Sequence, residues 1–350
     1  MNKRVLLGMS GGVDSSVSAI LLKQAGYEVV GATMQMWKPK DCAYFGCVED
    51  AKKVCNQIGI EHITIDCEEI FEKKVINNFI QFYQDAKTPN PCVECNKYLK
   101  FGIFVEKAKE LNCDYIATGH YAKVEFSEKY NQYILKKSDV EAKDQSYFLY
   151  GISKDVLPKM IFPLENIENK EAVRKIAQNS NLNVAKKPDS QEICFIPDND
   201  YGKFLQENLN RLPDKGKIVL QDETVLGSHK GLIYYTVGQR KGLGIAYKEP
   251  LYVIKLDKEK NQVIVGNEKD LYSKEVIASN LNFMLDLDLS EPIEIKAKVR
   301  YRAIPAKATL EILKDKRAKI IFEEPQRAIT PGQSVVFYID GIVLGGGIIE

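Results

Sequence analysis

The stretch Ser10-Gly-Gly-Val-Asp-Ser-Ser16 follows directly after a short apolar run, Val5 to Met9, that has the right length for a buried strand. The next residues, 17–25, have helical periodicity, so the stretch lies at a strand-to-helix turn. Adjacent glycines let the backbone turn its N–H groups inward, and the N-terminus of the following helix adds partial positive charge. The stretch therefore predicts an anion site of pyrophosphate size.

Side chains of the same stretch extend this site. The hydroxyls of Ser10, Ser15 and Ser16 can add hydrogen bonds, and Asp14 could hold a magnesium ion rather than the phosphate itself. An ordinary tight turn capped by Ser and Asp is the alternative. That alternative suits a lone Gly-Gly pair better than the whole stretch at a strand end, so we expect nucleotide binding.

Neither of the two commoner nucleotide loops matches here. No Lys follows the glycines, as a Walker-type loop requires, and G-x-G-x-x-G is absent from the stretch. The seven residues instead resemble the PP-loop of the ATP pyrophosphatases, which cleave ATP between its α- and β-phosphates and adenylate a substrate oxygen. This resemblance implies ATP as cosubstrate and leaves the acceptor open.

Composition sets the broad class. The chain has 350 residues, 45% hydrophobic and 28% charged, which is typical of a soluble globular protein with two or three domains. No apolar run approaches the length of a membrane span, so we expect no membrane association. The net charge of +1 requires any RNA-binding surface to be a local patch. Eight cysteines without an export signal favour a reducing cytoplasm.

The first part of the chain alternates between strand and helix, which predicts an α/β fold with a parallel sheet covered on both faces. Ligands of such sheets gather at the carboxyl ends of the strands. The expected strands are 3–9, 27–34, 62–67 and 114–120, and the expected helices are 17–26, 48–59, 70–83, 100–112 and 170–180.

After residue 210 or so the pattern changes to short β-rich runs separated by turns. This pattern predicts a small β domain followed by a six-stranded or similar β-barrel, with the boundary near residue 270. The expected runs are 216–220, 251–256, 261–266, 294–302, 308–313, 318–322, 333–338 and 341–349.

Cysteines provide the second candidate site. In residues 88–101, TPNPCVECNKYLKF, two prolines predict a rigid loop with the helix resuming near Asn96, and Cys92 and Cys95 flank that point. A thiol near a helix N-terminus has a lowered pKa, and the nearby lysines 97 and 100 act in the same direction.

Cys194 is the third cysteine of interest, inside the polar, turn-forming segment 188–197. A single cysteine is more often a small buried hydrophobe than a catalyst. The surrounding sequence nevertheless predicts reactive thiols at Cys95 and Cys194, and less strongly at Cys92. Cys55, Cys67 and Cys113 are expected in the core.

Several motifs in order resemble one family, the bacterial tRNA-specific 2-thiouridylases (MnmA/TrmU family). They are GMSGGVDSS, TPNPCVECNKYLKF, ATGHYA, KDQSYFL, DSQEICFIP, GLIYYTVGQRKGLGI, VRYR and the terminal GIVLGGGII. The resemblance implies a PP-loop domain (adenine nucleotide α hydrolase-like), a small β-rich central domain and a C-terminal β-barrel that together grip a tRNA anticodon stem-loop. We accordingly expect domains at residues 1–205, 206–270 and 271–350.

The resemblance also implies a reaction. ATP adenylates the C2 oxygen of the wobble uridine, and sulfur then displaces AMP to give 2-thiouridine. Cys194 would receive sulfur as a persulfide from a donor protein, either a persulfide relay or a cysteine desulfurase. Cys95 would be its catalytic partner and end disulfide-linked to Cys194. The matched ATP-binding positions are Gly8, Met9, Ser10, Gly11, Gly12, Val13, Asp14, Ser15, Met34 and Gly119.

The same resemblance assigns contacts with tRNA. A wobble base must leave its stack to be modified, and the matched stretch that meets it is Asn90, Pro91 and Cys92. The other matched tRNA contacts are His120, Lys143, Asp144, Gln145, Arg300, Tyr301, Arg302 and Gln333. A structural role and a general-base role remain open for His120, while His62 and His229 are expected to be structural.

Cys92 departs from the family pattern, in which many members have Asp. Cys92, Cys95 and Cys194 could instead hold a 4Fe–4S cluster with one open iron, which would make Cys194 a ligand. The C-x-x-C spacing also suits zinc or a redox pair. Cys42 and Cys47 form either a second metal pair or an ordinary cysteine-containing loop.

Two other functions compete with this one. A different PP-loop enzyme, such as an amidating synthetase or a tRNA lysidine synthetase, would adenylate an oxygen but use an amine as nucleophile and need no cysteine pair. A non-catalytic RNA-binding or metal-storage protein that kept the ATP fold is the other, and the intact stretch 10–16 argues against it.

Overall fold

The computed structural model describes residues 3–36, 48–186, 193–196, 198–209 and 211–350. The chain divides into two compact units. The first comprises Met1–Val75, Cys92–Asn199 and Asp340–Val343, and the second comprises Ile76–Pro91, Asp200–Ile339 and Leu344–Glu350. Each unit has its own hydrophobic core.

The first unit contains a parallel sheet, which confirms the predicted α/β class. Its strand order is β3-β2-β1-β4-β7, and every pairing is parallel. Val5, Leu6 and Leu7 of β1 are fully buried, as expected for a central strand that is covered on both faces. The strands are β1 (Arg4–Gly8), β2 (Glu28–Gln35), β3 (Glu61–Asp66), β4 (Tyr115–Ala117) and β7 (Met160–Ile161).

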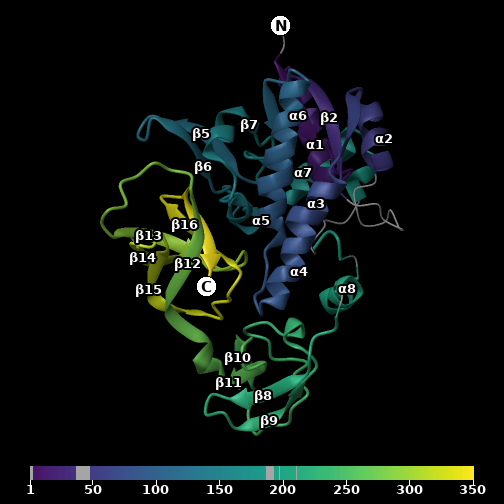
Figure 1. Ribbon diagram of the computed structural model, residues 1–350. Helices are drawn as coiled ribbons and strands as arrows, with labels where there is room; N and C mark the ends of the chain where they lie inside the picture. Colours follow the sequence, from purple (N-terminus) through teal and green to yellow (C-terminus); the bar gives the residue numbers. More distant parts are fainter. Residues whose placement is uncertain (1–2, 37–47, 187–192, 197, 210) are drawn as a thin grey trace. The chain divides into compact units, whose positions relative to one another are not determined.

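Three helices share the core with this sheet: α1 (Val13–Gln24), α2 (Val48–Ile58) and α7 (Lys170–Asn179) (Figure 1). Val17 of α1, Val54 of α2 and Val173 of α7 belong to one buried cluster with β1. This packing fixes the start of α1 at the carboxyl end of β1.

The next helical stretches contain π-helical turns that the sequence pattern did not predict. Residues 68–84 comprise α3 (Glu68–Phe71), a π-turn (Glu72–Ile76) and α4 (Asn77–Gln84), of which α4 belongs to the second unit. Residues 91–110 comprise α5 (Pro91–Cys95), a second π-turn (Asn96–Ile103) and α6 (Phe104–Glu110). The expected helix start near Asn96 was therefore wrong. The helix begins at Pro91, because the first helical position tolerates proline.

The remaining elements of the first unit are short. The hairpin of β5 (Lys123–Ser127) and β6 (Gln132–Lys136) was not predicted from the sequence, and its strands mix polar residues with apolar ones such as Ile134 and Leu135, which are buried. Single 3₁₀ turns are at Glu141–Lys143, Ser146–Phe148, Lys154–Lys159 and Asn183–Lys186.

The second unit begins its β-rich part with a four-stranded sheet of order β10-β11-β8-β9. Val253, Val263 and Val265 form the centre of its core, each fully buried. α8 (Tyr201–Asn208) precedes the sheet, and its Tyr201 stacks on Tyr83 of α4. The strands are β8 (Gly216–Leu220), β9 (Val225–His229), β10 (Tyr252–Asp257) and β11 (Gln262–Gly266), with 3₁₀ turns at Leu232–Tyr234 and Glu268–Leu271.

A closed antiparallel barrel of six strands completes the chain, as predicted. The order is β12-β15-β14-β13-β16-β17, and β12 pairs with β17 to close it. A Cβ on Gly345 would lie 2.3 Å from the carbonyl oxygen of Asn282, so only glycine permits this closure. The strands are β12 (Tyr272–Phe283), β13 (Ile293–Lys298), β14 (Ala306–Ile312), β15 (Ala318–Arg327), β16 (Ser334–Ile339) and β17 (Ile342–Ile349).

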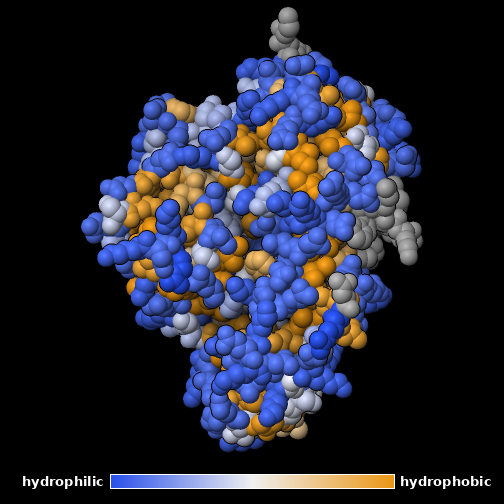
Figure 2. Space-filling model, viewed as in Figure 1, coloured by the Kyte–Doolittle hydropathy of each residue, from blue (hydrophilic) through white to orange (hydrophobic). Residues whose placement is uncertain are grey.

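Figure 2 shows hydrophilic residues over most of the visible face, with apolar patches between them. Within the described ranges, no helix is both long and apolar enough to cross a bilayer.

Candidate active site

The loop between β1 and α1 has the expected strand-to-helix geometry. Gly11 has φ +68°, a left-handed conformation that suits glycine, and Gly12 caps α1 in an extended conformation. The Ser15 and Ser16 hydroxyls donate to the Gly12 carbonyl at 3.1 and 2.7 Å, and the Ser10 N–H donates to Ser15 Oγ at 3.3 Å. These bonds preorganise the loop, because its own side chains stabilise the turn.

Asp14, in the first turn of α1, is held by two residues that the sequence analysis missed. Lys170 Nζ lies 2.8 Å from each carboxylate oxygen, and the Tyr121 hydroxyl donates to Oδ1 at 2.8 Å. The sequence signal that could have pointed to Lys170 is its place at the start of a helix, directly after the cap Asn169, where a lysine is unusual. Tyr121 is in turn fixed by Gln145, which accepts the Tyr121 N–H at 3.0 Å and donates to its carbonyl at 2.9 Å.

Gly119 and Met34, the two other matched nucleotide positions, lie at the carboxyl side of the sheet. Gly119 follows β4, and a Cβ there would lie 3.1 Å from both Asp14 C and Ser15 N. Glycine therefore permits the close approach between this segment and α1. Met34 is the second-last residue of β2.

His120 is buried and neutral. Its Nδ1 lies 2.7 Å from Thr118 Oγ1, and Lys100 Nζ lies 3.5 Å from Nε2. Burial, with a smaller contribution from Lys100, lowers the pKa of His120 well below 6.5. With 8% of its surface exposed, His120 is a group packed into the protein.

The structure brings Cys92, Cys95 and Cys194 together in the first unit. Burial raises the pKa of Cys194 most and the neighbouring Cys95 and Cys92 raise it further, whereas Lys100 acts on all three thiols in the opposite direction. Cys95 is 8% exposed, whereas Cys92 and Cys194 are exposed. Phe195 packs edge-on against Phe71 at 5.7 Å and so fixes the segment that carries Cys194.

The expected lowering of the thiol pKa values was wrong. Desolvation raises the pKa of Cys92 to about 11 and that of Cys194 to about 12, and it also raises that of Cys95. Cys92 and Cys194 are set into the protein without being sealed from solvent, so surrounding protein outweighs the favourable charge of Lys100. These thiols are therefore mainly protonated at neutral pH.

The other cysteines are placed as follows. Cys55 and Cys67 are buried, as expected, and Cys113 is half-buried. Cys42 and Cys47 lie outside the described residues. In the part of the chain that the structure describes, no group of three or more His, Cys, Asp or Glu side chains is arranged to hold a metal ion.

Three family models together match nearly the whole chain. Residues 3–198 match the tRNA methyl transferase HUP domain, residues 202–267 the tRNA methyl transferase PRC-barrel domain, and residues 273–349 the aminomethyltransferase β-barrel domain.

Full-length relatives are named tRNA-specific 2-thiouridylase MnmA. The chain is 47% identical to that of Clostridioides difficile, with 100% of this chain and 99% of the relative covered. It is 48% identical to that of Acetivibrio thermocellus, with 99% of both covered. The chain belongs to the MnmA family of tRNA-specific 2-thiouridylases. A solved U34-tRNA thiolase, NcsA from Methanococcus maripaludis, is 22% identical over 59% of this chain and 67% of that chain, with a TM-score of 0.37, too low to add an argument.

In this MnmA-family chain, the segment Lys143–Gln145 has a strong internal role. Asp144 is buried, and its carboxylate accepts hydrogen bonds from the backbone of Ser138 and from both the backbone and hydroxyl of Ser146. Gln145 is tied to Tyr121, as described above. Lys143 is half-buried.

In the second unit, Gln333 organises the loop before the cysteine motif. Its amide donates to the carbonyls of Thr88 and Pro89 at 3.2 and 2.9 Å. The next two residues of this loop are Asn90 and Pro91, the positions matched to the target base. Gln333 thus positions the loop that carries them.

The segment Arg300–Arg302 was expected to continue a strand, which was wrong. β13 ends at Lys298, and the three residues form a turn with Arg300 and Arg302 exposed. Lys298 lies over the Tyr301 ring, 5.6 Å from its centroid. A turn presents these side chains outward, as a phosphate-binding patch requires.

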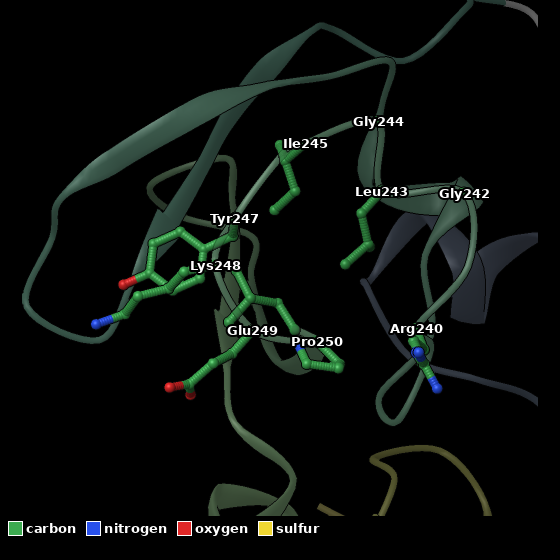
Figure 3. A pocket seen from close by; sticks show the side chains of 10 residues that line it. Arg240, Gly242, Leu243, Gly244, Ile245, Tyr247, Lys248, Glu249 and Pro250 are labelled. Carbon is green, nitrogen blue, oxygen red and sulfur yellow. The ribbon is translucent and has the colours of Figure 1, made fainter.

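A pocket of about 430 Å³ lies in the second unit and contains none of the predicted site residues (Figure 3). Arg240 and Lys248 supply positive charge to it and Glu249 negative charge, while Tyr247 supplies an exposed aromatic ring and Leu243 a buried apolar side chain. The motif GLIYYTVGQRKGLGI pointed to this segment without assigning it a role.

Proposed function

We propose that this protein is an ATP-dependent tRNA-uridine 2-sulfurtransferase acting on the wobble uridine. One observation carries the proposal: a PP-loop at the start of α1 and three neighbouring thiols occur in the same compact unit of a MnmA-family chain. An adenylating loop without thiols would suit an amidating synthetase, and thiols without the loop would suit a redox protein.

In the first half-reaction, the uridine C2 oxygen attacks the α-phosphate of ATP and pyrophosphate leaves. The N–H groups at the start of α1 would stabilise the negative charge that develops on the departing pyrophosphate. Gly119 supports this arrangement, since its backbone packs directly against the Asp14–Ser15 peptide.

Magnesium would be held at Asp14, with most of its ligands supplied by phosphates and water. The Asp14 carboxylate fits this role in part. Its Oδ1 accepts hydrogen bonds from both Tyr121 and Lys170, whereas Oδ2 accepts one from Lys170 and has a second lone pair that can bind a cation. Bound there, the ion would neutralise charge on the pyrophosphate.

In the second half-reaction, sulfur replaces the activated oxygen. The terminal sulfur of a Cys194 persulfide attacks C2, and AMP leaves. Cys95 thiolate then attacks the Cys194 sulfur, which releases the 2-thiocarbonyl and leaves a Cys95–Cys194 disulfide for a thiol reductant to reduce. Exposure supports these roles, since a donor protein can reach Cys194 while Cys95 is sheltered.

A 4Fe–4S cluster on Cys92, Cys95 and Cys194 is the alternative sulfur carrier. Three thiols have the right chemistry, and Cys92 is the residue that favours this route. The described residues are not arranged as a metal-binding group, so we derive no step through a cluster.

We also assign RNA contacts to the second unit. The Arg240–Lys248 pocket and the Arg300–Arg302 turn combine positive charge with tyrosine rings, a combination suited to phosphates and unstacked bases. The anticodon stem-loop of tRNA, the sulfur-donor protein, a cytoplasmic location and the domain limits 1–205, 206–270 and 271–350 remain part of this proposal.

The test is thiolation of an unmodified tRNA transcript with ATP and sulfide, using anaerobically purified protein whose iron content is measured beforehand. Formation of 2-thiouridine with AMP and pyrophosphate supports the proposal, and activity without iron contradicts the cluster as sulfur carrier. Absence of 2-thiouridine with every sulfur source would contradict the function.

A further inference from the structure

Neither half-reaction assigns a role to the ion pair between Asp14 and Lys170. The ammonium contacts both carboxylate oxygens at 2.8 Å, and the side chains of Lys170 and Asp14 are 11% and 32% exposed. A half-buried pair with a third donor, Tyr121, is better fixed than an ordinary surface pair. The pair is therefore a defined structural element.

The position of Lys170 is not explained by its own helix. Lys170 is the first residue of α7, directly after the cap Asn169, whose side chain accepts the Ala172 N–H at 2.8 Å. The positive end of a helix disfavours a cation. Asp14, by contrast, is well placed in the first turn of α1. The partner at Asp14, rather than α7, accounts for a lysine at this point.

Asp14 in turn belongs to the turn that forms the anion site. The backbone around Asp14 and Ser15 contacts Gly119 so closely that a Cβ there would lie 3.1 Å away. Tyr121, two residues further on, donates to the Asp14 carboxylate. The carboxylate thus joins α1, the segment after β4 and α7 at the edge of the proposed nucleotide site.

We propose that Lys170 is a positioning residue for nucleotide binding, an inference that takes ATP from the proposed function. Lys170 fixes the Asp14 carboxylate and offsets its negative charge, so that the start of α1 accepts a polyphosphate. Without the ammonium, the Asp14 charge repels the phosphates. The loss is then smaller when a divalent cation is present to supply positive charge.

The test is ATP affinity, measured by isothermal titration calorimetry with and without magnesium. Lys170→Met should weaken ATP binding about ten- to hundredfold without magnesium, and less with it. Lys170→Arg, which keeps the charge, should restore most of the affinity. Lys175→Met, an exposed lysine on the same helix, is the matched control and should bind ATP like the wild type.

A double-mutant cycle decides whether Lys170 acts through Asp14. In an Asp14→Asn background, Lys170→Met should have little further effect on ATP affinity. Independent losses in the two single variants would overturn the proposal, as would a Lys170→Met protein that binds ATP like the wild type. Thermal unfolding of each variant verifies folding at the assay temperature, and Lys170→Gln, which removes the charge but keeps a polar side chain, replaces the methionine variant if that variant does not fold.

These measurements distinguish a failure of the proposed role of Lys170 from a failure of the proposed function. Wild-type protein that binds ATP but forms no 2-thiouridine would reject the proposed function and leave the role of Lys170 intact. Active wild-type protein whose ATP affinity does not depend on Lys170 would reject only the role of Lys170.

Discussion

At the level of single residues, the three thiols differ in what can reach them. Cys92 and Cys194 are exposed, whereas Cys95 is 8% exposed. The surrounding protein raises the pKa of all three, so none is a free thiolate at neutral pH.

The persulfide route predicts different effects for the three thiols. Cys95→Ala and Cys194→Ala should each reduce thiolation by about 10⁴-fold, because residues that act as a unit fail together. Cys92→Asp, which restores the commoner family residue, should retain thiolation. Rates of 2-thiouridine formation by nucleoside mass spectrometry test this. Loss of activity in Cys92→Asp together with loss of bound iron would favour the cluster instead.

His120 predicts a pH dependence of stability. Its folded-state pKa lies well below 6.5, so the unfolded chain binds the proton more readily as the pH falls through 6.5. The free energy of unfolding should therefore decrease below that pH, by at most about 1.4 kcal/mol per pH unit from this group. His120→Asn should flatten this dependence in urea titrations at pH 7 and pH 5.5. An equal slope in both proteins would contradict the assignment.

At the level of elements, periodicity predicted the parallel sheet and most helices, because buried strands and amphipathic helices leave a clear apolar pattern. It failed at Pro91, where proline begins a helix, and at the short hairpin of β5 and β6, where polar and apolar residues are mixed. The π-turns left no pattern to detect. The Asp14–Lys170 pair was equally hidden, since the two residues are 156 positions apart in sequence.

Because β12 and β17 close the barrel at Gly345, replacing this glycine should lower the free energy of unfolding. A methyl group there would overlap Asn282 and Phe283 across the β12–β17 pairing, so Gly345→Ala should destabilise the protein by about 1–3 kcal/mol. Gly341→Ala is the control, because a Cβ at this position would meet no atom within 4 Å. Its only cost is the strain of a non-glycine residue at φ +80°, about 1 kcal/mol. Urea denaturation compares them. Equal losses would show that the clash is relieved by a small shift.

At the level of the whole molecule, the features on which the proposed function depends are distributed over both units. The first unit contains the loop and the thiols, and the second contains the barrel, the basic turn and the loop held by Gln333. Sequence resemblance predicted three domains, at residues 1–205, 206–270 and 271–350, and did not predict that residues 76–91 group with the β-rich part of the chain. It did not predict that Asp144, Gln145 and Gln333, matched to tRNA contacts, have their side chains engaged in internal hydrogen bonds.

The central claim is that activation of oxygen and its replacement by sulfur are coupled in one chain. The most direct measurement is the stoichiometry of AMP released to 2-thiouridine formed, with one unmodified tRNA transcript, ATP and a sulfur source. We expect equal amounts of the two products, and AMP formation that requires the tRNA. Steady AMP release with no 2-thiouridine, or 2-thiouridine formed without ATP, would contradict the account.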